Sequence, residues 1–310
     1  MVIKVKGLVK KYKELTALDH FNMEVEEGEI LGLLGPNGCG KTTAMNCILS
    51  LLNFDKGEIE IFGRKMTPNS YDIKKRIGLV PQEVSVFENL TVKENIDYFC
   101  GLYIEDKNMR KQYVDEAIEF VDLKDYVKFF PKKLSGGLKR RLNIACGIAH
   151  KPELILLDEP TVGVDAQSRN FMLDGIKKLN KKGSTIIYTT HYLEEAEMLC
   201  KRIIIMDRGK NLVSGTKEGL KSMITTSEKI VAGFSNIEDD MIKKLKTLPH
   251  VTDIEKDDED YMIKFENGFN NLANLLDFIK ENDLTYTKLH SQLPTLNDVF
   301  LELTGKELRD

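Results

Sequence analysis

The sequence predicts an α/β fold with a largely parallel sheet, followed by a small α+β domain. Short apolar runs rich in Ile, Leu and Val alternate with longer amphipathic segments along most of the chain. Apolar runs bounded by turns are typical of strands buried on both faces, and their alternation with helices is typical of parallel sheets. The pattern changes near residues 223–228, which marks the boundary between the two domains.

The first domain is expected to span residues 1–222. Its strands are predicted at 30–34, 77–80, 154–157, 185–189 and 203–206. Its helices are predicted at 41–52, 111–121, 137–150, 167–181 and 192–200.

The second domain is expected to span residues 223–310. Its predicted order is β-α-β-β-α-β, which is the ferredoxin-like arrangement. The elements are strands 229–233, 251–256, 261–266 and 284–290, helices 238–247 and 270–282, and a last helix from Thr295. Ferredoxin-like domains have many roles: this one could sense a ligand, contact its twin in a dimer or brace the first domain. We favour dimerisation or regulation.

Chain length, net charge and cysteine pattern exclude several classes of function. A chain of 310 residues suits two domains, and its net charge of −4 provides no basic field for nucleic acid or an anionic membrane. The five cysteines are scattered without a C-x-x-C pair, which argues for free thiols in a reducing compartment and against zinc.

No segment reads as a signal peptide or a membrane span. The first residues, MVIKVKGLVKKYK, alternate apolar and charged side chains, and later apolar runs are only a few residues long. A spanning helix needs roughly 20 apolar residues. We therefore expect a cytoplasmic chain.

A glycine-rich loop follows the first of these buried strands. It matches G-x-x-x-x-G-K-[ST] with a strand before it and a helix after it, as a phosphate-binding loop requires. Its backbone N–H groups and the positive end of the helix dipole favour a phosphate. Lys41 is expected to reach the β- and γ-phosphates, and Thr42 to hold Mg²⁺. A simple helix-capping turn is the alternative. The loop comprises Gly35, Pro36, Asn37, Gly38, Cys39, Gly40, Lys41, Thr42 and Thr43.

Two acidic residues end the strand LILL. Asp158 is expected to orient Mg²⁺ through water, and Glu159 to polarise the water that attacks the γ-phosphate. Pro160 is expected to keep Glu159 extended, because proline disfavours helical geometry in the preceding residue. Solvated acids at a strand end are the alternative.

A second anion-type site occurs in the motif LSGG. Ser135 is a good N-cap residue, and Gly136 and Gly137 expose backbone N–H groups at the start of a basic helix. Helix geometry alone leaves open whether both sites meet the same nucleotide. An ordinary Ser-Gly-Gly turn is the alternative.

LSGG followed by a basic helix and then LILLDEP resembles the ABC ATPase family. The resemblance implies a P-loop ABC-type ATPase domain with a helical subdomain, which binds ATP and Mg²⁺. In that family the LSGG turn of one subunit closes over the ATP held by another subunit's phosphate loop. Ser135 and Gly137 would then contact the γ-phosphate in trans, within a homodimer or heterodimer. The usual Gln after LSGG is Leu138 here, as in many exporter-type members.

Other positions match the family pattern in order. Tyr12 matches the aromatic residue that stacks on adenine, and Gln82 the residue that links Mg²⁺ and the attacking water to the groove where the membrane subunit docks. Asp165 matches the loop that signals across the dimer. His191 matches the histidine that contacts the γ-phosphate. Tyr12 could instead be a strand-edge tyrosine, and a lone histidine such as His191 is more often structural than catalytic.

The tail LPTLNDVFLELTGKELRD is similar to that of drug-exporter subunits of the daunorubicin-resistance type. The resemblance implies an ATPase on the inner face of the cell membrane that drives a separate permease in export. The cargo is not visible in the sequence.

Two rival classes remain. A soluble ABC ATPase acting on nucleic acid or ribosomes usually carries coiled-coil inserts, zinc cysteines or tandem cassettes, which this sequence lacks. A nucleotide kinase would not explain LSGG or His191. Within the loop, Cys39 is either a reactive thiol with a lowered pKa or a filler of a small-residue position.

Overall fold

The chain folds into two compact units. The structure is a computed structural model, and it describes residues 1–224, 226–266 and 270–305. The first unit covers Met1–Thr216, and the second begins at Lys217, a few residues before the predicted boundary. The end of the predicted second domain, 306–310, lies outside the described residues.

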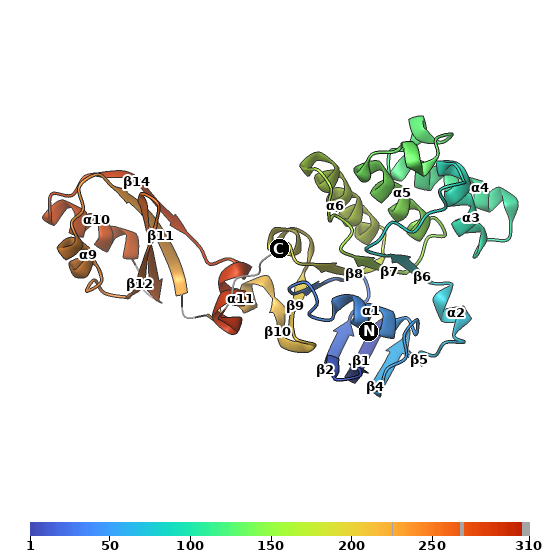
Figure 1. Ribbon diagram of the computed structural model, residues 1–310, viewed down its shortest axis with the longest axis horizontal. Coiled ribbons are helices and arrows are strands. Elements are labelled where there is room, and N and C mark those ends of the chain that lie inside the picture. The colour runs from blue at the N-terminus through green and yellow to red at the C-terminus, as the bar shows by residue number, and fades with distance from the viewer. Residues whose placement is uncertain (225, 267–269, 306–310) are drawn as a thin grey trace. The chain divides into compact units, whose positions relative to one another are not determined.

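A largely parallel sheet forms the centre of the first unit (Figure 1). Its strand order is β10-β9-β3-β8-β7-β6, with antiparallel β10 at one edge. All five predicted strands are confirmed, and every residue of β3, β7 and β8 is buried. The strands are β3 (Ile30–Leu34), β6 (Ile77–Val80), β7 (Leu154–Asp158), β8 (Thr185–Thr190), β9 (Arg202–Asp207) and β10 (Lys210–Thr216).

An antiparallel sheet that the sequence analysis did not predict covers one side of the parallel sheet. Its order is β2-β1-β4-β5. Figure 1 shows α1 (Lys41–Ile48) between the two sheets. Phe21 of β2, Met45 of α1 and Leu156 of β7 belong to one buried core. The strands are β1 (Ile3–Tyr12), β2 (Leu15–Val25), β4 (Lys56–Ile61) and β5 (Arg64–Lys65).

Helices cover the other side of the parallel sheet (Figure 1). Of these, α3 was not predicted, and it packs with α4 and α5 as the expected helical subdomain. Side chains cap several helix starts: Thr91 for α3, Asp106 for α4, Ser135 for α5 and Asp165 for α6. The helices of this unit, beyond α1, are α2 (Tyr71–Lys74), α3 (Val92–Gly101), α4 (Lys107–Phe120), α5 (Gly136–Ile148), α6 (Ala166–Lys181) and α7 (Leu193–Leu199).

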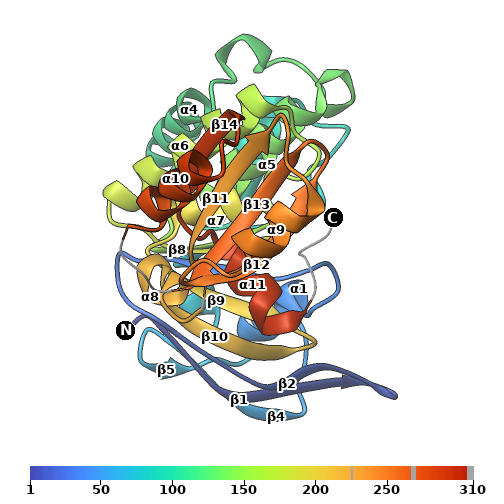
Figure 2. The same cartoon turned by 90° about the vertical axis from the view of Figure 1, so that its left-hand side faces the viewer.

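The second unit has the predicted β-α-β-β-α-β order (Figure 2). Its antiparallel sheet has the order β12-β13-β11-β14, and Ile230, Ile263 and Phe265 pack with α10 residues in one core. The elements are α8 (Lys217–Lys221), β11 (Thr226–Phe234), α9 (Asp239–Leu245), β12 (Val251–Asp257), β13 (Asp260–Glu266), α10 (Asn271–Glu281), β14 (Tyr286–Gln292) and α11 (Leu296–Thr304).

None of the helices in the described ranges has both the length and the apolar character needed to cross a bilayer.

Candidate active site

The glycine-rich loop forms a tight turn between β3 and α1. Gly38 and Gly40 have φ angles of 78° and 111°, which favour glycine. A Cβ on Gly35 would lie 2.3 Å from the carbonyl oxygen of Met206, and one on Gly40 would lie 2.6 Å from that of Ala17. A Cβ therefore has no room at Gly35 or Gly40. The loop delivers the chain to the start of α1, where backbone N–H groups have no helical partner.

Lys41 lies at the end of this loop, and its ammonium group contacts backbone carbonyl oxygens and a carboxylate. Its Nζ donates hydrogen bonds to the carbonyl oxygens of Gly35 (2.7 Å) and Pro36 (3.1 Å). The same Nζ lies 2.9 Å from Glu159 Oε1, and both side chains are almost completely buried. The phosphate-loop lysine therefore holds the carboxylate that the sequence assigns as the base.

Glu159 does not have the extended backbone predicted from Pro160. Its φ is 44°, in the left-handed region, so that prediction is wrong. Its N–H donates to Thr189 of β8, to both the carbonyl oxygen (3.2 Å) and Oγ1 (3.0 Å), and these bonds hold the turn that leaves β7. The left-handed conformation costs about 1–2 kcal/mol for a non-glycine residue, and such strain is concentrated at functional sites.

Two further predicted residues reach the same carboxylate. His191, directly after β8, is buried with Nδ1 3.0 Å from Glu159 Oε2. Gln82, in the loop after β6, donates from Nε2 to Glu159 Oε2 at 3.4 Å. The fold thus joins Lys41, Gln82, Glu159 and His191, which are far apart in sequence, in one cluster at the carboxyl ends of parallel strands. Ligands bind in this region of open α/β sheets.

The side chains predicted to hold the metal would bind it through oxygen atoms. Asp158 is buried beside Glu159, and its Oδ1 accepts a hydrogen bond from Thr189 Oγ1 (2.6 Å). Thr42 lies exposed in the first turn of α1, next to Lys41, with Thr43 after it. Among the described residues, no cluster of three His, Cys, Asp or Glu side chains surrounds a metal position.

The LSGG turn lies away from the phosphate loop. Ser135 caps α5, with its Oγ accepting from Leu138 N (3.3 Å), and Gly136 is exposed. A Cβ on Gly137 would lie 2.7 Å from Ser168 Oγ and 3.4 Å from Asp165 Oδ2, so the turn packs against the start of α6.

Helices α5 and α1 lie on opposite sides of the parallel sheet (Figure 1). Within the described ranges, no hydrogen bond or ion pair joins the LSGG turn to the loop 35–43.

Tyr12 and Asp165 are both at the surface. Tyr12 is 45% exposed at the end of β1, with Lys10 Nζ 5.0 Å from the centroid of its ring. Asp165 is the N-cap of α6, and hydrogen bonds from Ser168 lower the pKa of its carboxyl. Each side chain is accessible to a ligand or to another chain.

Sequence reasoning missed Arg140 on α5. Its guanidinium donates to the carbonyl oxygen of Gln82 and to that of Val162 (3.4 Å), so it joins the Gln82 loop to the loop after Glu159. Burial lowers the pKa of this arginine. The only signal in the sequence was a basic position after LSGG, where a solvated helix face is the ordinary interpretation.

Cys39 occupies a small-residue position. It is buried, and burial raises the pKa of its thiol despite the opposing charge of Lys41. Burial and the raised pKa favour the filler alternative over the reactive-thiol alternative.

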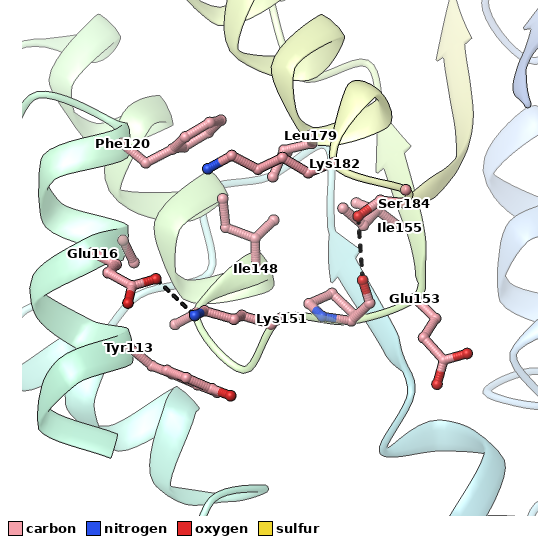
Figure 3. A pocket seen from close by; sticks show the side chains of 14 residues that line it. Tyr113, Glu116, Phe120, Ile148, Lys151, Glu153, Ile155, Leu179, Lys182 and Ser184 are labelled. Atoms are coloured by element: carbon pink, nitrogen blue, oxygen red, sulfur yellow. Dashed lines mark hydrogen bonds and ion pairs between the residues drawn. The ribbon is translucent and has the colours of Figure 1, made fainter. Parts of the chain in front are cut away.

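A cavity of about 360 Å³ lies at the amino ends of the parallel strands, opposite the end that carries the Glu159 cluster (Figure 3). It is lined by α4, the end of α5, the start of β7 and the end of α6. Its Lys151 pairs with Glu116 at 2.7 Å, and its Glu153 pairs with Arg76. Because the cavity faces the amino ends of the strands, it does not belong to the Glu159 cluster.

A phosphate loop joined to a buried carboxylate and a histidine at strand ends defines a nucleoside triphosphatase of the P-loop class. Residues 18–162 match the family model described as ABC transporter. Residues 215–304 match the model of the C-terminal domain of DrrA1-3-like ATP-binding proteins.

Relatives match over the whole chain. The linearmycin resistance ATP-binding protein LnrL of Bacillus subtilis (strain 168) is 36% identical over 100% of both chains. The daunorubicin resistance ATP-binding protein DrrA3 of Streptomyces coeruleorubidus is 32% identical over 99% of this chain and 97% of the relative.

A solved dimeric ATP-binding cassette, MJ0796, in a post-hydrolysis state with ADP and Pi, superposes with a TM-score of 0.64. It is 28% identical, and the match covers 69% of this chain and 98% of that one. The chain therefore belongs to the ATP-binding subunits of the ABC transporter family, and it is an ATPase.

Proposed function

We propose that two copies of this chain bind ATP between them and use its hydrolysis to drive a separate membrane permease in export. The observation that carries this proposal is the cluster of Lys41, Gln82, Glu159 and His191. The cluster supplies a base and one phosphate ligand, but it has no further groups to bind the γ-phosphate from its other side. The exposed Ser135 turn would supply those groups from the other copy.

In each composite site the loop N–H groups and Lys41 bind the β- and γ-phosphates. Ser135 and Gly137 of the second copy bind the γ-phosphate from the opposite side, and Tyr12 stacks on the adenine. Glu159 accepts the proton of the attacking water, while His191 and Gln82 hold the carboxylate and the γ-phosphate in position. Asp165 contacts the second copy.

The residues expected to hold Mg²⁺ fit that ion. A hydroxyl, a carboxylate and an amide oxygen are hard ligands, and Mg²⁺ is usually held by few protein groups together with substrate phosphates. Thr42 and Gln82 would bind it directly, and Asp158 through water. Bound there, Mg²⁺ would neutralise charge on the β- and γ-phosphates.

A cleft beside the Gln82 loop is the proposed docking surface for the permease. It has a volume of about 450 Å³ and is lined mainly by apolar residues of the segment after α1, of β6, of α5 and of the end of α3 with the residues that follow it. Leu51 and Leu102 line it and are more than half exposed. An apolar cytoplasmic segment of the permease suits this surface, because exposed apolar patches mark interaction sites. The chain would then lie on the inner face of the membrane.

LnrL and DrrA3 are named for resistance to linearmycin and to daunorubicin, which supports the direction and the drug-like cargo class proposed here. They also favour this proposal over an ATPase that acts on nucleic acid or ribosomes.

A coupling experiment tests the docking surface. Leu102→Asp should reduce co-purification of the permease and permease-stimulated ATPase activity, while basal ATPase activity stays unchanged. Met109→Asp, at an exposed position of α4 outside the cleft, is the control. Undiminished permease binding by Leu102→Asp would contradict the assignment.

A further inference from the structure

Glu195, in the first turn of α7, is an almost completely buried acid outside the cluster described above. Its exposed fraction is 2%, and acids are rarely buried to this extent unless they are paired. Three buried hydroxyl groups donate to its carboxylate: Thr161 Oγ1 at 2.8 Å, Tyr188 OH at 2.7 Å and Thr190 Oγ1 at 3.1 Å. These donors come from the loop after β7 and from two positions of β8.

A cation from a third element lies beside the same carboxylate. Arg169 of α6 has Nε 3.6 Å from Glu195 Oε1, and its guanidinium lies 4.8 Å from the centre of the Tyr192 ring. A carboxylate only accepts hydrogen bonds, so each hydroxyl directs its single proton toward it. Burial and the Glu195 charge raise the pKa of Tyr188, so that phenol remains a donor.

Thr190 connects this network to His191. Its hydroxyl donates to Glu195 and accepts from Tyr192 N (2.9 Å), and its carbonyl oxygen accepts from Gly35 N (3.4 Å). The residues on both sides of His191 are therefore fixed by contacts that lead to Glu195 and to the phosphate loop.

Thr161 connects the network to Glu159 and Asp165. It lies two residues after Glu159, in a turn closed by Val162 N to Glu159 O and by Val164 N to Thr161 O, both at 3.3 Å. The turn leads directly to Asp165. Backbone hydrogen bonds shape the turn itself. The hydrogen bond from the Thr161 hydroxyl to Glu195 attaches the turn to α7.

We propose that Glu195 is a positioning residue that fixes the segments carrying Glu159, Asp165 and His191 relative to one another. The proposal rests on the roles proposed above for these three residues. Glu195 acts through these segments and not by contact with the nucleotide. Its carboxylate joins the loop after β7, the end of β8 and the start of α6, so one acceptor contacts all three segments. A displacement of about 1 Å at a reacting group can lower a rate about 100-fold.

The test compares kcat with ATP affinity in matched variants of the full-length chain. Glu195→Gln removes the charge and replaces one acceptor oxygen by a donor, and Thr161→Val removes one donor at similar volume. Each should lower kcat per folded molecule by about 10- to 100-fold. The Kd for ATP should stay within about twofold, because the loop and Lys41 are unchanged. Thr161→Ser keeps the hydroxyl and should restore kcat.

Glu194→Gln is the matched control, because Glu194 is the exposed neighbour on the same helix. Its kcat should equal that of the wild type. Thermal unfolding of every variant gives the folded fraction, so a loss that merely follows unfolding is separated from a loss of positioning.

Three results would overturn the proposal: wild-type kcat in both Glu195→Gln and Thr161→Val, a fall in ATP affinity as large as the fall in kcat, or no rescue by Thr161→Ser. Glu159→Gln in the same assay separates this failure from failure of the proposed site. An inactive Glu159→Gln with a fully active Glu195→Gln would refute the positioning role alone, whereas an active Glu159→Gln would refute the base.

Discussion

The contact between Lys41 and Glu159 makes the effect of Glu159→Gln predictable in two steps. The carboxylate lies 2.9 Å from Lys41 Nζ, and the two side chains are only 4% and 5% exposed. A γ-phosphate at Lys41 competes with this carboxylate for the same ammonium. The substitution therefore removes a base and also removes a competitor of the phosphate.

The two magnitudes follow from these contacts. Loss of a general base lowers turnover by about 10²- to 10⁴-fold. A hydrogen bond to a charged group contributes about 1.5–3 kcal/mol net, so removing the competitor should tighten ATP binding by about tenfold to a hundredfold. The variant should also accumulate as an ATP-bound dimer, because the γ-phosphate contacts shared by both copies persist.

The assay must separate binding by one copy from dimer closure. ATP titrations of Glu159→Gln in a Ser135→Arg background, where closure is blocked, report binding by the loop alone. Ser135→Arg by itself is the reference, and single-turnover hydrolysis of Glu159→Gln reports the chemistry. Wild-type turnover would refute the base, and weaker ATP binding than the reference would refute the competition between carboxylate and phosphate.

Three further predictions concern individual side chains. Lys41→Ala should weaken ATP binding outright in a direct titration, and unchanged affinity would contradict its role. Because burial raises the pKa of Cys39, a thiol reagent at neutral pH should leave the folded ATPase active, and rapid ATP-protected inactivation would show otherwise. Burial would raise the pKa of Asp298, but Lys229 and Thr295 hold it below its usual value. Its stabilisation of the second unit should be complete above about pH 4 and be lost as pH falls through the lowered folded pKa. Asp298→Asn should destabilise that unit by about 3 kcal/mol in denaturant unfolding and flatten this acid limb, and an unchanged limb would contradict the assignment.

The parallel sheet and the phosphate loop could be predicted from sequence because their signals are local. Each buried strand is a contiguous apolar run, and the residues from Gly35 to Thr43 have fixed spacing between a strand and a helix. The β-α-β-β-α-β order of the second unit was visible for the same reason. The antiparallel sheet β2-β1-β4-β5 was missed, because β1 is interrupted by register shifts and β4 is largely exposed.

The remaining features of the site depend on tertiary contacts. The left-handed φ of Glu159 results from hydrogen bonds to Thr189, thirty residues away, which outweigh the local effect of Pro160. Arg140 and Glu195 acquire their partners only when α5 and α7 pack, so their spacing gives no signal.

The composite site between two copies is tested most directly by mixing two inactive variants. Lys41→Ala lacks a phosphate-loop ligand, and Ser135→Arg lacks the turn offered to the other copy. A mixed dimer has one site in which both halves are intact, so an equimolar mixture should recover about a quarter of wild-type ATPase activity. If each copy completed its own site, both variants would stay inactive after mixing, and the absence of any recovery in dimers shown to contain both variants would contradict the account.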